Sequence, residues 1–494
     1  MLPEGLLCLL SASLAFAQSR TPLSINKITS LNTQRLPQQP SFAIPVHDTT
    51  PLAVSIALCS NAPPNPRFFI SNISNWDSQD DPGPSNLNGG IEIQLTDGQG
   101  NWTGLFPDGG ILAVDRNGAG AVAFDVAVSD SEPFHQTLKE LPLFGDTTSN
   151  QALLYSPPFL SVPPFKPTYP NYTLPAANLS QPELPASSST PNFTLILSRT
   201  DTTKNIPRTG CFLSSPSTQK SGVISSQSVW ARSSDWRSQF LMAGLTPATN
   251  YTAYVLQDST KVSGPIYFTT KSAAFTCPLV HSLPFCPSVG YAVPLPSPPN
   301  AATYDSTNLP DTISTPLISY LANFTTVLTT FACGRDWYSP IVGCDDCQRE
   351  YRSWLCSISF PRCGEPSPAS PDAFTAVPAP PSATGIAASL AGKGGSSPQQ
   401  VLSALLPQQT RDPPRNPFFP PPTTPYRQLL PCIEQCYATD RSCPPFLGFR
   451  CPSTSFNAGA SYGIGYIDSA DGDKGQGLTG VAQDRYGNVW CNLI

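Results

Sequence analysis

The chain has 494 residues, including 58 prolines and 33 glycines, and only 12% of its residues are charged. Average proteins contain about 5% proline and about 25% charged residues, so this composition excludes a long helical or coiled-coil protein and predicts short strands joined by many turns. The 27 basic and 33 acidic side chains give a formal net charge of −6 without a basic block, which argues against nucleic acid as a partner. A chain of this length has room for at least two domains.

Residues 1–17 are predicted to be a signal peptide. Residues 6–16 form an apolar run, and the small-x-small pattern of Ala15-Phe-Ala17 is the one that signal peptidase recognises. Glu4 departs from the usual basic start, and a buried N-terminal helix is the alternative interpretation. No run in the sequence reaches the roughly 18 apolar residues that a transmembrane helix requires. The mature chain is therefore expected to enter the secretory pathway and to be soluble in itself.

Seven N-x-Ser/Thr acceptor sites support the secretory route, and most are expected to carry glycans. The predicted glycosylation sites are Asn72, Asn101, Asn171, Asn178, Asn192, Asn250 and Asn323. Removing Cys8 with the signal peptide leaves an even number of cysteines, which are expected to form disulfides in an oxidising compartment. The predicted disulfide cysteines are Cys59, Cys211, Cys277, Cys286, Cys333, Cys344, Cys347, Cys356, Cys363, Cys432, Cys436, Cys443, Cys451 and Cys491.

The cysteines divide the chain, because twelve of them lie between Cys277 and Cys491. We expect these twelve to form six bridges among themselves. Cys59 and Cys211 would then pair with each other or remain the only free thiols. The connectivity within the set of twelve stays open.

Residues 18–156 are predicted to form a β-sandwich domain. Short β-type runs are separated by Gly, Pro and Asn. The alternation of apolar and polar residues in Ile91-Glu-Ile-Gln-Leu95 is typical of an antiparallel sheet with one solvated face. The proline-dense residues 157–190 are predicted to be an exposed linker.

Residues 191–275 are predicted to form a second β domain. The run Leu245-Thr-Pro-Ala-Thr-Asn-Tyr251 resembles the tyrosine corner of fibronectin type III domains, in which the tyrosine hydroxyl bonds back to the turn. Period-two alternation turns Tyr251, Ala253 and Val255 inward and Asn250, Thr252 and Tyr254 outward, so that a glycan on Asn250 reaches solvent. A generic β turn is the alternative interpretation.

Residues 276–494 are predicted to form a cysteine-rich, mainly helical domain. Apolar residues recur at helical spacing from Thr312 to Phe331, with Thr315 as N-cap and Pro316 at the first helical position. A second helix is predicted over Cys344–Ile358, and a third begins at Pro431.

Two arginines of the second helix are candidate partner contacts. Arg349 and Arg352 lie on its polar side, opposite the apolar stripe. Arg is favoured at protein interfaces, so these two residues are the predicted partner-binding positions.

Residues 365–425 are predicted to be a disordered insertion within the cysteine-rich domain. They contain 15 prolines in 61 residues and only six charges. Such a composition buries too little apolar surface to offset the entropy of ordering.

No motif predicts an active site, a metal or a cofactor. The Cys344-x-x-Cys347 spacing occurs in zinc sites and redox pairs, but export and the lack of a second such pair favour structural disulfides. Ser461 lies in a G-x-S-x-G run, yet a hydrolase needs a later histidine, and the histidines, His47, His135 and His281, all precede it. The acidic run at residues 468–473 does not fit the EF-hand spacing.

The cysteine pattern of the last domain resembles a known family. The segments that carry the resemblance are Cys333-Gly-Arg-Asp-Trp-Tyr-Ser-Pro340, Cys344-Asp-Asp-Cys347, Tyr351-Arg-Ser-Trp-Leu-Cys356, Phe360-Pro-Arg-Cys363, Pro431-Cys-Ile-Glu-Gln-Cys436 and Cys443. They are similar to the fungal stretch-activated calcium-channel component, the Mid family. Their spacing also resembles Frizzled-type cysteine-rich domains.

The resemblance implies a glycosylated, non-catalytic regulatory subunit of the high-affinity calcium channel of fungal plasma membranes, supporting Ca²⁺ influx under stress or stretch. The implied partner is a pore-forming voltage-gated-type calcium channel α subunit, through which the chain would associate with the membrane. The implied location is the extracellular face of the plasma membrane, with the endoplasmic reticulum as a second location. A secreted adhesion or cell-wall-binding glycoprotein is the alternative function.

Overall fold

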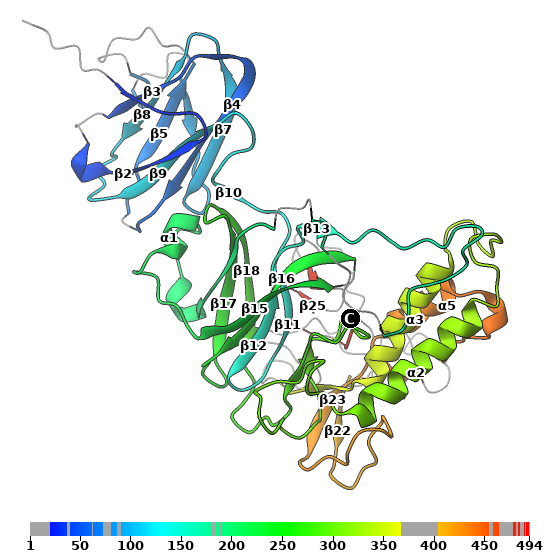
Figure 1. Ribbon diagram of the computed structural model, residues 1–494. Coiled ribbons are helices and arrows are strands. Elements are labelled where there is room, and N and C mark those ends of the chain that lie inside the picture. The colour runs from blue at the N-terminus through cyan, green and yellow to red at the C-terminus, as the bar shows by residue number, and fades with distance from the viewer. Residues whose placement is uncertain are drawn as a thin grey trace, which may run out of the picture. The chain divides into compact units, whose positions relative to one another are not determined.

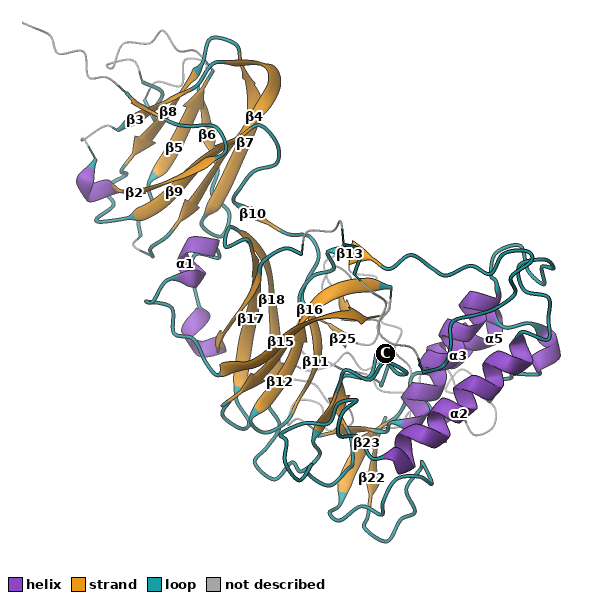
Figure 2. Cartoon of the chain, in the orientation of Figure 1, coloured by secondary structure: helices purple, strands orange, loops and turns teal. Residues whose placement is uncertain are grey.

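The structure is a computed structural model in which two units are distinguished (Figures 1 and 2). Unit 1 comprises Met1–Gln136 and Ile206–Ser215, and unit 2 comprises Thr137–Asn205 and Pro216–Ile494. The described residues are 20–36, 40–61, 63–72, 81–85, 90–178, 184–186, 190–232, 234–366, 404–453, 458–463, 478–480, 483–484, 489 and 491–493. The predicted signal peptide lies outside them.

Unit 1 contains two sheets that share one core. The five-stranded sheet has the order β1 (Thr21–Pro22), β3 (Ser41–Ile44), β8 (Gly110–Asp115), β5 (Arg67–Ser71) and β6 (Ile91–Ile93). The four-stranded sheet has the order β2 (Lys27–Asn32), β9 (Ala123–Ser129), β4 (His47–Leu58) and β7 (Gln99–Phe106). The short helices are η1 (Thr33–Arg35) and α1 (Gly210–Ser214). Phe68 and Phe124 meet edge to face in the core, with ring centroids 5.2 Å apart, as expected for a sandwich filled by alternate residues of both sheets.

Unit 2 begins with a second pair of sheets. One sheet has the order β11 (Leu143–Thr147), β12 (Gln151–Tyr155), β16 (Asp235–Ala243) and β13 (Leu160–Ser161), with β15 (Val223–Arg232) also paired to β16. The other has the order β10 (Gln136–Thr137), β18 (Lys261–Thr269), β17 (Asn250–Gln257) and β14 (Phe193–Arg199), and η2 (Thr200–Thr203) follows β14. The Thr246 N–H donates to the Tyr251 hydroxyl at 2.9 Å, so the bond predicted for the corner is present.

The domain boundaries differ from those expected from the sequence. Residues 18–156 were expected to form one domain, but β12 pairs with residues 239–243 of β16 in unit 2. All five residues of β12 are buried, and a fully buried strand carries no pattern that says which sheet it joins. The predicted linker at 157–190 is not an exposed connector throughout, because β13 pairs with β16 and Ala177 lies in a core with the helices.

The remainder of unit 2 contains helices, short strands and six disulfides. Its helices are α2 (Asp311–Leu328), α3 (Cys344–Ser359), α5 (Ile433–Ser442), η4 (Pro445–Leu447) and α6 (Ala458–Ser461). Its strands are β19 (Leu279–Val280), β20 (Tyr291–Ala292), β21 (Arg362–Gly364), β22 (Leu405–Gln408), β23 (Tyr426–Leu429), β24 (Leu478–Gly480) and β25 (Gln483–Asp484). Helices α2, α3 and α5 lie side by side (Figure 1). Among the described residues, none of the helices combines the length and apolar character needed to cross a membrane.

The start of α2 corrects a sequence prediction. Pro316 was expected at the first helical position, but α2 begins at Asp311 and Pro316 lies inside it. Ile313 is 1% exposed and packs in the same core as Leu317 and Leu321. Burial of Ile313 extends the apolar stripe by one turn, and this gain offsets much of the cost of a proline after the first turn.

Part of the predicted disordered insertion has a defined structure. Residues 367–403 lie outside the described residues, but residues 404–425 are described. Their strand β22 pairs with β23, which follows them in the sequence, and their Phe419 packs edge-on against Phe360 with ring centroids 6.0 Å apart. The prediction relied on the proline content of residues 365–425 as a whole, and this average gave no weight to the few apolar residues that pack locally.

The fourteen cysteines that the structure describes pair as seven bridges. The pairs are Cys59–Cys211, Cys277–Cys363, Cys286–Cys356, Cys333–Cys344, Cys347–Cys443, Cys432–Cys491 and Cys436–Cys451. Several join residues that are 59 to 96 positions apart, so they close long loops around the three main helices.

A buried ion cluster joins the pair of sheets in unit 2, which we call the second sandwich, to the cysteine-rich part of the same unit. Asp146 of β11 is fully buried, and its carboxylate lies 2.8 Å from the Lys271 ammonium and 3.0 Å from the Arg362 guanidinium. Burial opposes ionisation, but the two cations prevail and hold the pKa of Asp146 below its usual value. This cluster connects three segments that are far apart in the sequence.

Candidate partner-binding surface

A disulfide-closed loop connects α2 to α3. Cys333 bridges Cys344, 11 residues later, so the two cysteines close residues 333–344 into a ring that we call the Cys333–Cys344 loop. Inside it, the Tyr338 hydroxyl lies 2.6 Å from the Gly343 carbonyl oxygen and 2.7 Å from that of Ser442. Burial raises the pKa of Tyr338, so this group stays a neutral donor. The loop is therefore fixed by a covalent bond at its ends and a hydrogen bond near its centre.

Two large apolar side chains of this loop face solvent. Trp337 is 79% exposed and Ile341 is 88% exposed, the highest values among the large hydrophobic residues that the structure describes. Both line a pocket of about 210 Å³. A single exposed hydrophobic residue is ordinary, but two of them on a loop closed by a disulfide, around one pocket, form a preorganised apolar surface of the kind that protein interfaces use.

A larger groove of about 700 Å³ adjoins this pocket along α3. The residues that line both hollows are Lys166, Ile341, Asp345 and Asp346. The groove also reaches Gln435 of α5 and Ser234, which precedes β16. The exposed pair Trp337 and Ile341 thus borders a groove whose lining mixes charged and apolar groups, and protein interfaces commonly combine an apolar centre with a polar rim.

The end of the groove at the start of α3 is acidic. Asp346 accepts a hydrogen bond from the Gly343 N–H at 2.8 Å and one from Arg349 at 2.7 Å. The buried oxygen Oδ2 of Asp345 has no hydrogen-bond partner among the described residues. Burial and the charge of Asp346 raise the pKa of Asp345. Hydrogen-bond donors or cations of a partner would complement this end.

The two arginines predicted as partner contacts have different positions. The Arg349 side chain is 47% exposed and lies in the groove wall, 2.7 Å from Asp346 and 3.4 Å from Glu350. Arg352 is only 8% exposed, so its prediction as a surface position is wrong. Its guanidinium donates to the Ala176 carbonyl at 3.4 Å, and burial lowers its pKa to about 10.

Arg352 is buried because the proline-dense residues 157–190, which we call the proline-rich segment, pack against α3. The Gln348 side chain donates to the Pro175 carbonyl at 2.7 Å, one turn before Arg352. The segment therefore covers part of the face of α3 that helical periodicity alone assigns to solvent. Trp337 and Ile341 were missed because a loop has no periodicity. The available signal was two large apolar residues between closely spaced cysteines.

The seven predicted glycosylation sites are all described and all exposed. They lie in both units, and Asn323 is on the outer side of α2, away from its buried stripe. None of them lines the pocket or the groove.

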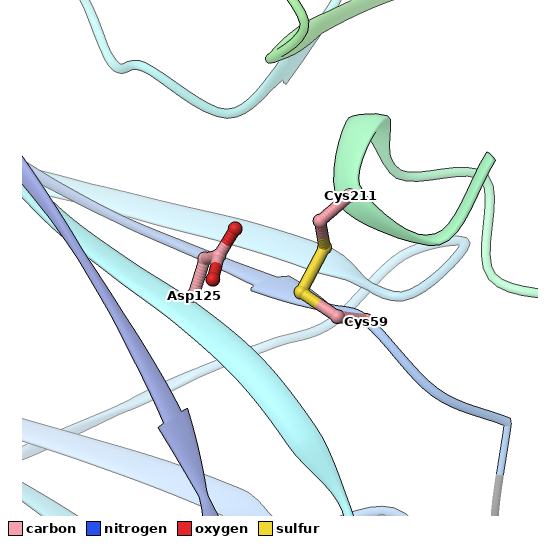
Figure 3. A group of neighbouring side chains, drawn as sticks. All are labelled: Cys59, Asp125 and Cys211. Carbon is pink, nitrogen blue, oxygen red and sulfur yellow. A yellow bond between two sulfur atoms is a disulfide. The ribbon is translucent and has the colours of Figure 1, made fainter. Parts of the chain in front are cut away.

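Two groups of side chains in the described residues come within metal-binding distance of one another. One is Cys59, Asp125 and Cys211, shown in Figure 3, and the other is Cys432, Glu434 and Cys491. In each group the two sulfur atoms are bonded to each other. A thiolate, not a disulfide, is the form of cysteine that ligates metals, so neither group has the ligand set of a zinc site.

The acidic run at residues 468–473 lies outside the described residues, and the other chemical motifs are described. Cys344 and Cys347 bridge to different partners, Cys333 and Cys443, so the Cys-x-x-Cys run does not form a redox pair. Ser461 ends α6. The hydrogen bonds of the three histidine rings go to hydroxyl groups other than that of Ser461. They join His47 to Thr49 and Thr50, His135 to Ser55, and His281 to Ser282 and Thr303.

Comparisons with known proteins identify the family. The family model described as "Stretch-activated Ca2+-permeable channel component" (Mid1) matches residues 49–479; this description is of a channel component, not of an enzyme. The chain is 35% identical over 443 residues to the stretch-activated cation channel MID1 of Cryptococcus neoformans var. grubii, covering 81% of this chain and 69% of that protein. It is 29% identical over 235 residues to the stretch-activated cation channel yam8 of Schizosaccharomyces pombe (46% of this chain, 41% of yam8). It is 27% identical over 285 residues to MID1 of Saccharomyces cerevisiae (55% of this chain, 43% of that protein). The match to the family model spans most of the sequence, and the chain therefore belongs to the Mid1 family of stretch-activated Ca²⁺-permeable channel components.

Proposed function

We propose that this protein is a non-catalytic, extracellular regulatory subunit of a plasma-membrane calcium channel and that it supports stress- or stretch-activated Ca²⁺ influx. Its partner in this proposal is a pore-forming voltage-gated-type calcium channel α subunit, through which it associates with the membrane. Family membership supports the role in a channel. The Cys333–Cys344 loop, which presents Trp337 and Ile341 to solvent, is the observation that supports a docking role.

The energetics of this loop suit protein association. Fully burying a large apolar side chain contributes about 1.5–3 kcal/mol, and Trp is enriched among the residues that dominate binding energy. Because the loop is closed by a disulfide and tied through Tyr338, little conformational entropy would be lost on docking. We assign the half-exposed Arg349 to the polar rim of the same contact.

We also propose that the seven acceptor asparagines carry glycans, since each is exposed. Their absence from the pocket and groove linings leaves the proposed docking surface free of acceptor sites. Glycans elsewhere would keep other faces solvated.

The test is affinity purification of the tagged full chain from fungal membranes. A large channel chain is expected to co-purify with it. Changing Trp337→Ser and Ile341→Ser together is expected to leave secretion unchanged, because both side chains are exposed. Recovery of the channel is expected to fall at least about tenfold, because hot-spot residues each contribute about 2 kcal/mol or more.

The matched control is Val223→Ser in β15, which removes an apolar side chain that is 70% exposed far from the loop in sequence. It is expected to keep full recovery of the channel. Full recovery with the double variant would place the contact elsewhere. Recovery of the wild-type chain only from the medium or with wall polysaccharide would contradict the channel role and favour a secreted adhesion or cell-wall-binding glycoprotein.

A further inference from the structure

The bridge between Cys59 and Cys211 differs from the other six in its surroundings. Both of its cysteines are partly exposed, whereas every other bridge in the described residues contains at least one buried cysteine. Access of a thiol to a sulfur atom is one determinant of the rate of disulfide exchange. Cys59–Cys211 is therefore the one bridge in the described residues that an external thiol can approach from either cysteine.

A carboxylate lies beside the two sulfur atoms. An oxygen of Asp125 and the two Sγ atoms all lie within 4.8 Å of one another (Figure 3). This placement follows from strand alternation, because Phe124 and Val126 of β9 fill the core and Asp125 between them faces outward. No salt bridge within the described part of the chain neutralises Asp125.

We propose that Cys59–Cys211 is a thiol-exchange site for small extracellular thiols, and that Asp125 controls its rate by electrostatic repulsion. An incoming thiolate attacks Sγ of one cysteine, the Sγ–Sγ bond breaks, and its electron pair leaves on the other sulfur, which takes a proton from solvent. A second thiolate then attacks the mixed disulfide and releases the first cysteine. Two thiols are thereby oxidised to one small disulfide, and the bridge is reduced to two cysteine thiols.

Asp125 slows each exchange step in two ways, by repelling the negative charge of the transition state and by disfavouring the thiolate that leaves. The transition state carries a negative charge spread over the attacking, central and leaving sulfur atoms, and the carboxylate repels that charge. The same carboxylate disfavours the cysteine thiolate as a leaving group, and a poorer leaving group slows exchange. The bridge whose two cysteines are both partly exposed is therefore protected by charge instead of by burial, and anionic thiols are rejected most strongly.

Non-covalent contacts would hold the reduced cysteines near each other. Cys211 lies in the segment Ile206–Ser215, which belongs to unit 1 although both flanking segments belong to unit 2. The Thr209 hydroxyl donates to the Leu58 carbonyl at 2.6 Å, next to Cys59. The Arg208 guanidinium lies 3.1 Å from the Asp97 carboxylate. These contacts keep the segment in place after reduction, so the bridge is able to re-form.

The experiment follows reduction of each bridge in the native, secreted full chain by differential alkylation and mass spectrometry. The probes are glutathione, which is anionic, and cysteamine, whose amine is cationic. In the wild type, Cys59–Cys211 is expected to open before the other bridges and to react faster with cysteamine once thiolate concentrations are matched. Asp125→Asn is expected to raise the glutathione rate about tenfold and the cysteamine rate less, and 1 M salt is expected to shrink both effects.

Asp48→Asn is the matched control, since Asp48 is an exposed carboxylate at the opposite end of β4 from Cys59. It removes the same charge and is expected to leave the rate unchanged. Earlier opening of any other bridge would overturn the assignment of the exchange site. An unchanged rate in Asp125→Asn, with normal secretion and thermal stability, would overturn the role of Asp125.

Discussion

Replacing Asp146 is predicted to destabilise unit 2 strongly. Asp146→Ala removes the carboxylate that lies against the buried Lys271 and Arg362 cations, and removing one partner of a buried ion pair typically costs about 3–5 kcal/mol. The backbone N–H groups of Thr147 and Ala292, at 2.8 Å and 3.2 Å, also lose their acceptor, and each unsatisfied buried donor costs about 1–3 kcal/mol. Since whole domains are stable by only about 5–15 kcal/mol, we expect secretion of Asp146→Ala to be severely reduced.

Asp146→Asn separates charge from hydrogen bonding, because an amide oxygen still accepts a backbone N–H while the negative charge is lost. We expect it to lower the free energy of unfolding by about 3 kcal/mol and to be secreted at an intermediate level. The control is Asp336→Asn, which breaks an exposed ion pair with Arg335 and is expected to leave the melting temperature unchanged. The measurement is secretion level together with the melting temperature of the transition assigned to unit 2.

The pH dependence of stability gives an independent readout of the same cluster. The pKa of Asp146 is lower in the folded protein than its unfolded value of about 3.9. The stabilisation that its charge supplies is therefore fully present above about pH 4 to 5 and is lost as pH falls through the folded pKa. Asp146→Asn should lose less stability than the wild type over this acidic range. Normal secretion and an unchanged melting temperature of Asp146→Ala would refute the reasoning.

The remaining predictions concern the cysteine-rich part of unit 2. Trp354→Ala is expected to lower the free energy of unfolding by about 3 kcal/mol and so to reduce secretion. The indole donates to the Tyr462 hydroxyl at 3.0 Å and packs edge-on against Phe449. Normal secretion with loss of channel binding alone would instead make Trp354 a contact residue. Replacing residues 367–403 with a short Gly/Ser linker is expected to preserve secretion, since their composition predicts little burial. Extending the deletion through residue 425 is expected to reduce secretion by removing Phe419 from the core, and equal secretion of the two deletions would contradict this.

Local patterns in the sequence predicted the features that depend on near neighbours. Helical spacing located α3 to within one residue of its end at Ser359, because an amphipathic helix repeats its apolar face every three to four residues. Strand alternation placed Tyr251, Ala253 and Val255 in the core, but its prediction that Thr252 and Tyr254 face solvent is wrong, because both faces of β17 are covered and these two side chains are buried as well. The run of cysteine motifs after Cys333 indicated the family, since residue spacing is a property of the sequence alone.

Tertiary structure decided the features that depend on distant partners. Asp146 meets Lys271 and Arg362 across separations of 125 and 216 residues, and no local periodicity encodes such a meeting. Arg352 lies on the polar side of its helix, but the proline-rich segment covers it. Residues 143–155 joined the second sandwich because a buried strand packs wherever a matching edge is available. Sequence periodicity reports which face of an element is apolar, whereas the packing of the whole chain determines what covers that face.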